Sequence, residues 1–309
     1  MTAMKNGMLD EFACRVKEKN LRVITAVVRQ GGRITARHDF EKERAVNLFS
    51  VSKTFVSMAV GIAMGEGRFN LEDKVVDFFP EAPQDRGEYL ELMTVRDLLV
   101  MGTGHAECPL QKAGWTVGGE CELDIPGLFF AEPVVYRPGT RFLYNSSATY
   151  MLSRIVSSTT GELLSDYIYD RALKYLGIQK PRWDTTGGYT QGFIGLHMNA
   201  AELSEFGQLV FDGGAAGGRQ LIPAGYIEEA SKKQIDNSDN RMDHPDQRAG
   251  YGYQMWRNTW PNSYRMDGAG GKFVLMLPDY GAVITIVSEE WRNMFAILEL
   301  VWETVMNKL

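Results

Sequence analysis

The sequence predicts an α+β fold in which one antiparallel sheet carries a mostly helical insertion. β-branched and aromatic runs typical of strands lie near both ends of the chain, within 21–38 and 251–287. Segments with helical spacing of apolar residues fill most of the region between them. Further helical segments precede the first strand run and follow the last one. We therefore expect strands from both ends to pair in one sheet that is flanked by N- and C-terminal helices.

The N-terminal segment is predicted to form a helix, a hairpin and a second helix. Apolar residues recur at helical spacing over 8–20. Two strand-like runs, 21–28 and 33–38, are separated by a glycine doublet that suits the positive φ of a tight hairpin turn. A long apolar helix then starts at Ser50 and ends near Gly65.

The middle of the chain is predicted to be a succession of helices with few strands. Short helices with threonine or charged starts are expected over 71–80 and 94–99, and a longer one over 146–160. A capping box at 199–202 starts another. The glycine cluster at 213–218 follows a helix rather than a strand, which favours a turn over a phosphate-binding loop.

The C-terminal segment returns to strands and closes with an amphipathic helix over 294–305. Together with the N-terminal elements it is predicted to form a sheet lobe of residues 1–70 and 246–309. Residues 71–245 then form the mainly helical lobe, with the active site in the cleft between the lobes. The expected C-terminal strands cover 251–257, 263–266, 272–277 and 282–287.

Composition restricts the possible partners of the chain. Its 309 residues are 44% hydrophobic and 23% charged, as in ordinary globular proteins. The net charge of −6 and the scattered basic residues argue against nucleic acid or an anionic membrane surface. No uncharged apolar run is long enough for a membrane span. The first twenty residues lack the apolar core of a secretory signal, so a cytoplasmic location is expected.

Cysteine and histidine usage predicts neither disulfides nor a metal site. Cys14, Cys108 and Cys121 are odd in number and widely spaced, which suits a reducing compartment. The four histidines show none of the spacings of metal-binding motifs. We therefore expect no metal and no other cofactor.

Ser50 and Lys53 are the first candidate catalytic pair. Three residues apart at the start of an apolar helix, they lie on one face, one turn from each other. A serine at this place has the helix dipole and free backbone N–H groups beside it. Together these groups could supply a nucleophile, a base and donors for an oxyanion. The alternative is an N-cap serine and a solvated lysine on an ordinary core helix.

Two further segments carry possible chemistry. Tyr144 follows a turn and precedes an apolar helix. A phenol near a lysine ammonium has its charged form favoured, so it could accept the serine proton, although a packed ring with one hydroxyl partner explains it equally. The glycine-rich segment 268–271 precedes the strand 272–277. It permits close approach of a ligand to the backbone, or a tight hairpin turn, and both interpretations can hold together.

These three elements, in this order, resemble the serine β-lactamase-related hydrolases. This penicillin-recognising group includes class C β-lactamases, DD-peptidases and family VIII-type esterases. The resemblance runs from about residue 20 to 290 and includes the framework segments 48–54, 71–75, 93–99 and 138–146. It implies an antiparallel sheet lobe and a helical lobe with the active site between them.

The resemblance also implies roles for individual residues. Ser50 would be the nucleophile that becomes acylated, and Lys53 its base or proton relay, with a pKa lowered by burial. Tyr144 would share the proton and later help to activate the deacylating water. The backbone N–H groups of Ser50 and Ala269 would form the oxyanion hole, at about 3 kcal/mol for each donor.

The second motif departs from the family pattern. The family commonly has Tyr-x-Asn, whereas this chain has Tyr144-Asn145-Ser146. The amide of Asn145 is displaced by one position, so Ser146 is expected in the substrate-contacting place. His105 lies in a glycine-containing loop that could border the cleft, and it is a further candidate for substrate contact.

The third motif departs as well. It usually begins with a cation and continues x-Gly, but here it aligns with Met266, Asp267 and Gly268. A thioether cannot attract the carboxylate of a penicillin, and Asp267 would repel it if its side chain faces the cleft. Arg265 and Lys272 are the nearby cations that could compensate.

The expected function is a serine hydrolase that forms an acyl-enzyme on a small ester or amide, with weak or no β-lactamase activity. The alternative is a penicillin-binding or sensing protein on the same scaffold that acylates without efficient turnover. A structural protein with chance motifs is the third possibility. The predicted partner is a small acyl substrate, and the candidate contacts to it are Asn145, Ser146, Asp267, Gly268 and His105.

Overall fold

The computed structural model describes residues 7–116 and 123–309, and its centre is a six-stranded sheet in the order β2-β1-β12-β11-β10-β9. All neighbouring strands in this sheet are antiparallel, and β1 from the N-terminal segment pairs with β12 from the C-terminal one. The predicted α+β fold with one sheet built from both ends of the chain is therefore confirmed. The strands are β1 (Val23–Gln30), β2 (Arg33–Asp39), β9 (Trp256–Arg257), β10 (Tyr264–Gly268), β11 (Lys272–Leu277) and β12 (Ala282–Ser288).

The expected strand over 251–257 is shorter in the structure, where β9 has only two residues. The preceding segment folds back on itself, since the backbone N–H of Gly252 donates to the carbonyl of Met255 at 2.8 Å. Tyr251 and Trp256 consequently form an isolated bridge across this turn. Gln254, at the turn, has a φ of 58°. The run therefore forms a strand only at its end, after this turn.

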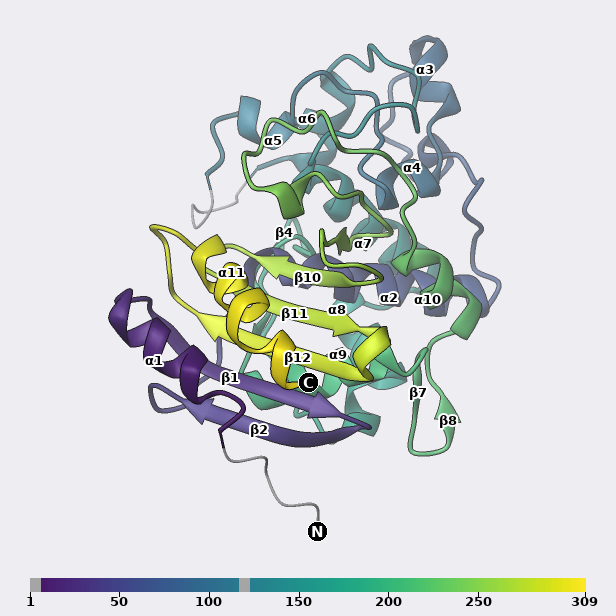
Figure 1. Cartoon of the computed structure of the whole chain (residues 1–309). Coiled ribbons are helices and arrows are strands. Elements are labelled where there is room, and N and C mark those ends of the chain that lie inside the picture. Colours follow the sequence, from purple (N-terminus) through teal and green to yellow (C-terminus); the bar gives the residue numbers. More distant parts are fainter. Residues whose placement is uncertain (1–6, 117–122) are drawn as a thin grey trace.

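Helices cover both faces of the sheet (Figure 1). On the outer face, α1 (Asp10–Glu18) and α11 (Phe295–Thr304) form an apolar cluster with alternate residues of β11, such as Phe273 and Leu275. On the inner face, α9 (Ala200–Phe211) packs on β1, β11 and β12. Gly207 allows this close approach, because a Cβ there would lie 2.6 Å from Val274 Cγ1.

The predicted helices of the middle segment are present, with one exception. Only a 3₁₀ turn, η2 (Val75–Phe78), forms within 71–80. The capping box of Asn199 and Glu202 starts α9 as expected. The α-helices of this part are α3 (Gly87–Leu92), α4 (Val95–Leu99), α5 (Pro109–Lys112), α6 (Ile125–Ala131), α7 (Ser146–Thr160), α8 (Leu164–Arg171) and α10 (Ala224–Ser231). Short strand pairs are β3 (Val46–Asn47) with β6 (His197–Met198), β4 (Thr185–Thr186) with β5 (Tyr189–Thr190), and β7 (Ala215–Ala216) with β8 (Arg219–Gln220).

Helix α2 (Ser52–Gly65) is the element that positions the site. It is buried from Ser52 to Ala63, which agrees with an apolar sequence that has no polar face. It packs against α7 and α8, and the 3₁₀ turn before it, η1 (Phe49–Val51), contacts β10. The start of α2 thus lies where the helices meet the sheet. The lobe boundaries at residues 70 and 245 stay a prediction.

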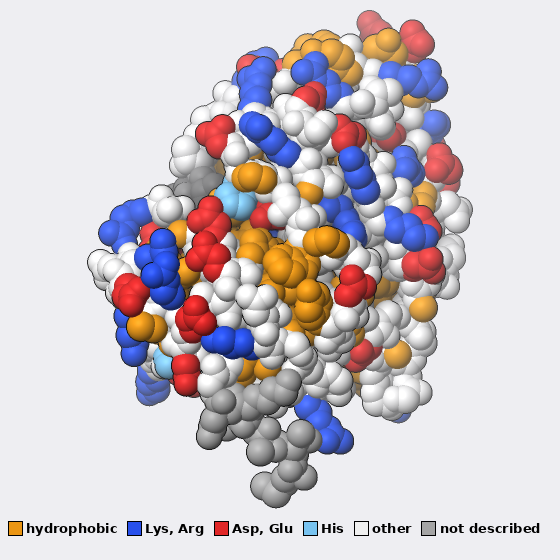
Figure 2. Space-filling view, viewed as in Figure 1, with side chains coloured by type: hydrophobic (Ala, Val, Ile, Leu, Met, Phe, Trp, Pro, Cys, Tyr) orange, Lys and Arg blue, Asp and Glu red, His pale blue; other side chains and the backbone are white. Residues whose placement is uncertain are grey.

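The surface carries charges of both signs. Figure 2 shows basic and acidic side chains interspersed over the face that α1 and α11 cover. None of the helices in the described part of the chain has the length and apolar character needed to cross a bilayer. The thiols of Cys14 and Cys108 are free, and Cys121 lies outside the described residues.

Candidate active site

Ser50 lies in a strained turn immediately before α2. The preceding residue, Phe49, has a φ of 49°, a backbone conformation that non-glycine residues rarely adopt. The side chain of Asn47 holds this turn by accepting hydrogen bonds from the backbone N–H groups of Phe49, at 2.9 Å, and Gly195, at 3.2 Å. Such strain persists only where surrounding contacts enforce it, and it concentrates at functional sites. Ser50 itself is partly exposed, so a ligand can reach its hydroxyl.

The amine of Lys53 is buried beside this hydroxyl. Its Nζ lies 3.0 Å from Ser50 Oγ, 3.3 Å from Ser146 Oγ and 3.2 Å from the carbonyl oxygen of Phe193. The side chain is 1% exposed, and no carboxylate of the described residues forms an ion pair with it. Desolvation consequently lowers the pKa of Lys53 to about 7. A solvated lysine on a core helix is therefore not what the structure shows.

Tyr144 completes the group from the segment that leads into α7. Its hydroxyl hydrogen-bonds to that of Ser50, and its ring centroid lies 5.0 Å from Lys53 Nζ. The ring packs against Trp256, with 5.3 Å between centroids. Burial raises the pKa of Tyr144 well above its ordinary value, although the bond from Ser50 opposes this shift. The expected preference for a phenolate is not seen, because burial disfavours charge on the phenol and on the neighbouring amine alike.

Asn145 and Ser146 have different places at the start of α7. Asn145 is the N-cap, buried, and its side-chain oxygen accepts from the backbone N–H of Ser147 at 3.0 Å. Its amide nitrogen donates to Thr103 Oγ1 at 3.3 Å. Both ends of the Asn145 side chain are thus used within the helical part, which differs from the predicted substrate contact. Ser146 instead faces Lys53, as its place in the motif suggested.

The end of β10 lies against the nucleophile turn. A Cβ on Gly268 would come within 2.3 Å of the carbonyl oxygen of Leu48 and 3.2 Å of the backbone nitrogen of Val51. Only glycine allows the strand to approach η1 this closely. Ala269 follows at once and is partly exposed, in the turn toward β11. This arrangement brings the candidate oxyanion residue beside the Ser50 turn, and its role stays a prediction.

Asp267 is paired rather than free. Its carboxylate accepts a hydrogen bond from Arg265 Nε at 2.9 Å and lies in an ion pair 2.8 Å from Arg265 Nη2, and both side chains are buried. Since side chains alternate along a strand, these two project from the face of β10 opposite to Gly268. The structure therefore gives Asp267 an ion pair in place of the predicted substrate contact. Asp267 was expected to repel a substrate carboxylate if it faced the cleft. Arg265 compensates its negative charge.

His105 is likewise engaged inside the protein. Its Nδ1 is 2.9 Å from Thr103 Oγ1, and its Nε2 is 3.1 Å from the carbonyl oxygen of Phe129. The ring is 2% exposed, and burial lowers the pKa of His105 to about 4. With both nitrogens occupied, the side chain orders the loop between α4 and α5. The predicted substrate contact does not agree with this placement, and we leave His105 out of the site.

Comparison with known proteins assigns the chain to a family. The family model described as Beta-lactamase matches residues 10–299. The chain belongs to the beta-lactamase family. A curated relative, the 6-aminohexanoate-dimer hydrolase of Paenarthrobacter ureafaciens, is 26% identical over 199 residues, which are 59% of this chain and 49% of the relative. Protein flp of Staphylococcus aureus is 24% identical over 44% of this chain and 28% of its own length. The chain thus matches about half or less of these relatives.

Solved structures show the same fold over nearly the whole chain. A penicillin binding protein from Bacillus halodurans has a TM-score of 0.75 at 16% identity and covers 97% of this chain and 99% of its own. EstCE1, a hydrolase with promiscuous acyltransferase activity, has a TM-score of 0.76 at 14% identity, covering 96% and 98%. At such identities the likeness shows the beta-lactamase fold alone.

One group at this site of the beta-lactamase family protein was not identified from the sequence, namely the carbonyl of Phe193, which accepts from Lys53. The glycines around Phe193 indicate a loop, but no pattern in a sequence shows where a backbone carbonyl points. Among the described residues, no group of three or more His, Cys, Asp or Glu side chains is placed to hold a metal ion.

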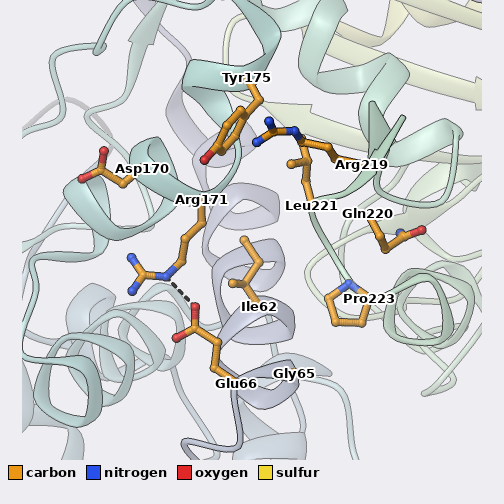
Figure 3. A pocket seen from close by; sticks show the side chains of 10 residues that line it. All are labelled: Ile62, Gly65, Glu66, Asp170, Arg171, Tyr175, Arg219, Gln220, Leu221 and Pro223. Atoms are coloured by element: carbon orange, nitrogen blue, oxygen red, sulfur yellow. Dashed lines mark hydrogen bonds and ion pairs between the residues drawn. The ribbon is translucent and has the colours of Figure 1, made fainter. Parts of the chain in front are cut away.

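A separate pocket of about 560 Å³ opens at the other end of α2 (Figure 3). Gly65 at the end of α2 and the following residue, Glu66, line it together with Tyr175 and Arg219. Arg171, which also lines the pocket, donates a hydrogen bond to Glu66 at 2.6 Å, so its guanidinium already has an acidic partner. None of the three candidate catalytic residues lines it, so this pocket is distinct from the Ser50 site.

Replacing Gly268 by alanine is expected to damage the site without removing a catalytic group. The new methyl would meet the Leu48 carbonyl, so β10 or the nucleophile turn must shift. We expect the free energy of unfolding to fall by about 1–3 kcal/mol, which lowers the melting temperature. Labelling of Ser50 by a fluorophosphonate should be more than tenfold slower. Gly225→Ala is the matched control, because no atom lies within 4 Å of a Cβ there. Equal labelling rates in both variants would contradict the expectation.

Proposed function

We propose that this protein is a cofactor-free serine hydrolase that cleaves small esters or amides through an acyl-enzyme. One observation carries the proposal: a buried amine without a carboxylate partner in the described structure lies 3.0 Å from a partly exposed serine hydroxyl. A structural lysine in such a place would leave its charge uncompensated. A general base, in contrast, needs a pKa near the working pH, which the burial of Lys53 provides.

The contacts of Lys53 suit the neutral amine. An uncharged amine has two N–H donors and one lone pair. The Phe193 carbonyl, which can only accept, and the Ser146 hydroxyl take the two donors. The lone pair then points to Ser50, whose hydroxyl proton it can receive as the oxygen attacks the acyl carbon. The fixed neighbours of the amine thereby orient it as a base.

Tyr144 is proposed to move the proton onward. Its raised pKa keeps the phenol neutral, so it can donate to the departing group and be reprotonated from Lys53. In the second half of the reaction the same pair would take a proton from the water that attacks the acyl-enzyme. The backbone N–H groups of Ser50 and Ala269 are proposed to hold the developing oxyanion, as the approach of Gly268 to the nucleophile turn supports.

The relatives support ester or amide cleavage more than β-lactam cleavage. One curated relative is named a hydrolase of a 6-aminohexanoate dimer, and a structural neighbour is named a hydrolase with acyltransferase activity. Met266 is buried and uncharged at the position where the family has a cation. Other structural neighbours are named penicillin-binding proteins, so slow acylation by a penicillin without turnover remains the second proposal.

Labelling tests the proposal directly. A fluorophosphonate should modify Ser50, as found by peptide mapping, and the labelled protein should lose activity on p-nitrophenyl esters. Nitrocefin and D-alanyl peptides then separate the subclasses. Intact-mass measurement after incubation with a penicillin distinguishes turnover from a stable adduct. Labelling at another residue, with ester cleavage unaffected, would refute the assignment of Ser50.

Tyr144→Phe is expected to reduce turnover of a p-nitrophenyl ester about a hundredfold or more, because the variant keeps the packing on Trp256 but cannot transfer a proton. Tyr226→Phe is the control. Tyr226 is a buried tyrosine whose hydroxyl bonds to Ser57, and that variant should retain activity. Comparable kcat in the two variants would exclude a proton-transfer role for Tyr144.

A further inference from the structure

A second buried amine lies next to the proposed site. Lys272, the first residue of β11, is 1% exposed. Its Nζ lies 4.9 Å from the ring centroid of Phe49 and 5.2 Å from that of Trp291. No hydrogen bond or ion pair joins this amine to any of the described residues. Aromatic faces compensate a buried cation only in part, so an anionic partner is missing.

The nearby carboxylates are already occupied. Glu289 accepts from Arg44 at 2.9 Å and from Arg22 at 3.3 Å. Glu290 is 1% exposed and accepts from backbone N–H groups, among them that of Arg22 at 3.1 Å and that of Arg292 at 2.9 Å. None of these groups can turn to Lys272 without abandoning partners of its own.

The amine lies against Gly270, next to the proposed oxyanion turn. A Cβ on Gly270 would lie 2.7 Å from Lys272 Nζ and 3.4 Å from the Trp291 ring, so glycine keeps this approach open. Gly270 directly follows Ala269, and Phe49 directly precedes Ser50. A group that is bound over Gly270 therefore lies close to both proposed oxyanion donors.

Trp291 lies on the solvent side of the Lys272 amine. It is 56% exposed and stands edge-on to Phe49, with 5.1 Å between ring centroids. The segment that carries it is fixed, since the backbone N–H of Glu290 donates to the Gly270 carbonyl at 3.0 Å and Ser288 Oγ donates to the same carbonyl at 2.6 Å. An exposed indole on a fixed backbone is a preorganised surface for the apolar part of a substrate.

We propose that Lys272 and Trp291 form an anion subsite that selects acyl substrates carrying a carboxylate near the scissile carbonyl. The carboxylate would pair with Lys272 Nζ over Gly270, and the chain between the two groups would lie along the Trp291 ring. Lys272 lies on the neighbouring strand, opposite Gly268, so this subsite differs in position from the one whose cation is replaced by Met266. This inference rests on the proposed hydrolase function and adds the class of substrate.

The amine remains charged under ordinary conditions. Burial lowers the pKa of Lys272 to about 8, with Arg44 acting in the same direction and Glu289 opposing it. The group is therefore mostly protonated at pH 7 and loses its proton as the pH rises above about 8. The preference for anionic substrates should fall over the same range, while cleavage of a neutral ester should not.

A matched pair of esters tests the subsite. We would compare kcat/KM for p-nitrophenyl butyrate with that for mono-p-nitrophenyl glutarate in the wild type, Lys272→Met and Arg44→Met. The expected result is that Lys272→Met reduces kcat/KM for the glutarate ester about tenfold or more, mainly through KM, and changes the butyrate value less than twofold. Arg44→Met removes one positive charge from the same region and should keep the wild-type preference.

A second measurement needs no variant. Free glutarate should slow fluorophosphonate labelling of Ser50 in the wild type, and sodium chloride of equal ionic strength should not. No protection by glutarate, or an equal loss on both esters in Lys272→Met, overturns the subsite. If the wild type neither labels at Ser50 nor cleaves the butyrate ester, the proposed hydrolase function itself has failed.

Discussion

Ser50→Ala is expected to abolish ester cleavage, with kcat reduced on the order of 10⁵-fold or more. The Ser50 hydroxyl is the only group that the proposed mechanism acylates, and the second hydroxyl beside Lys53, that of Ser146, belongs to a buried residue. Because Ser50 is partly exposed and lies outside the regular part of α2, the free energy of unfolding should change by less than about 1 kcal/mol. The measurements are p-nitrophenyl ester kinetics and thermal unfolding.

The adjacent segment offers a sharp control for this variant. Ser52 is the first residue of α2, and its Oγ is buried without a hydrogen-bond partner in the described structure. Replacing it by alanine removes an unsatisfied polar atom, so Ser52→Ala should keep activity and be at least as stable as the wild type. Residual turnover by Ser50→Ala comparable to that of Ser52→Ala would exclude the proposed nucleophile.

Lys53→Met is the second change with a large expected effect. We expect turnover to fall about 10²–10⁴-fold, because the variant has no base to accept the serine proton. Stability should rise, since methionine fills similar space without the desolvation that lowers the pKa of Lys53. Lys53→Arg is the matched variant: it keeps a positive charge but cannot act as a base, and should be equally inactive. Activity of Lys53→Arg near the wild-type level would show that charge, rather than proton acceptance, is required.

The pH dependence of the wild type follows from the same group. Activity should rise with pH through about 7, as the Lys53 amine loses its proton. Between about 7 and 10 the unfolded chain binds a proton at Lys53 that the native protein does not. Unfolding therefore takes up a proton, and the contribution of Lys53 to stability increases with pH over that range. Denaturant unfolding should show this slope in the wild type, and Lys53→Met should lose the part between about pH 7 and 8, while Lys272 still contributes at higher pH.

Much of the fold could be predicted from the sequence because its signals are local. Runs of β-branched and aromatic residues separated by glycine, proline, asparagine and aspartate predicted β1, β2, β11 and β12 within a residue or two of their observed limits. The capping box at Asn199 gave the start of α9. The prediction of one strand over 251–257 was wrong because a single glycine among aromatic residues does not show that the backbone turns, as it does at Gly252–Met255.

Some residues of the candidate site could be predicted from the sequence, and others could not. The three-residue spacing of Ser50 and Lys53 predicts a common face wherever the backbone is helical, and the order of the motifs indicated Tyr144. Three contacts could not be predicted from the sequence, because each depends on where a side chain points. They are the ion pair of Asp267 with Arg265, the hydrogen bonds of the buried His105 ring and the N-cap role of Asn145. A strand or loop position in a sequence does not determine that direction.

By itself the sequence determined which chemical groups are present and which of them share a helix face or a turn. Only the tertiary structure decided their protonation and their partners. Lys53 meets Ser146 from 93 positions away and Phe193 from 140 positions away. Desolvation and hydrogen bonding depend on such distant neighbours, and they set the pKa of Lys53 and Tyr144. The fold likewise decides that Lys272 lies between aromatic rings, without an anion among the described residues.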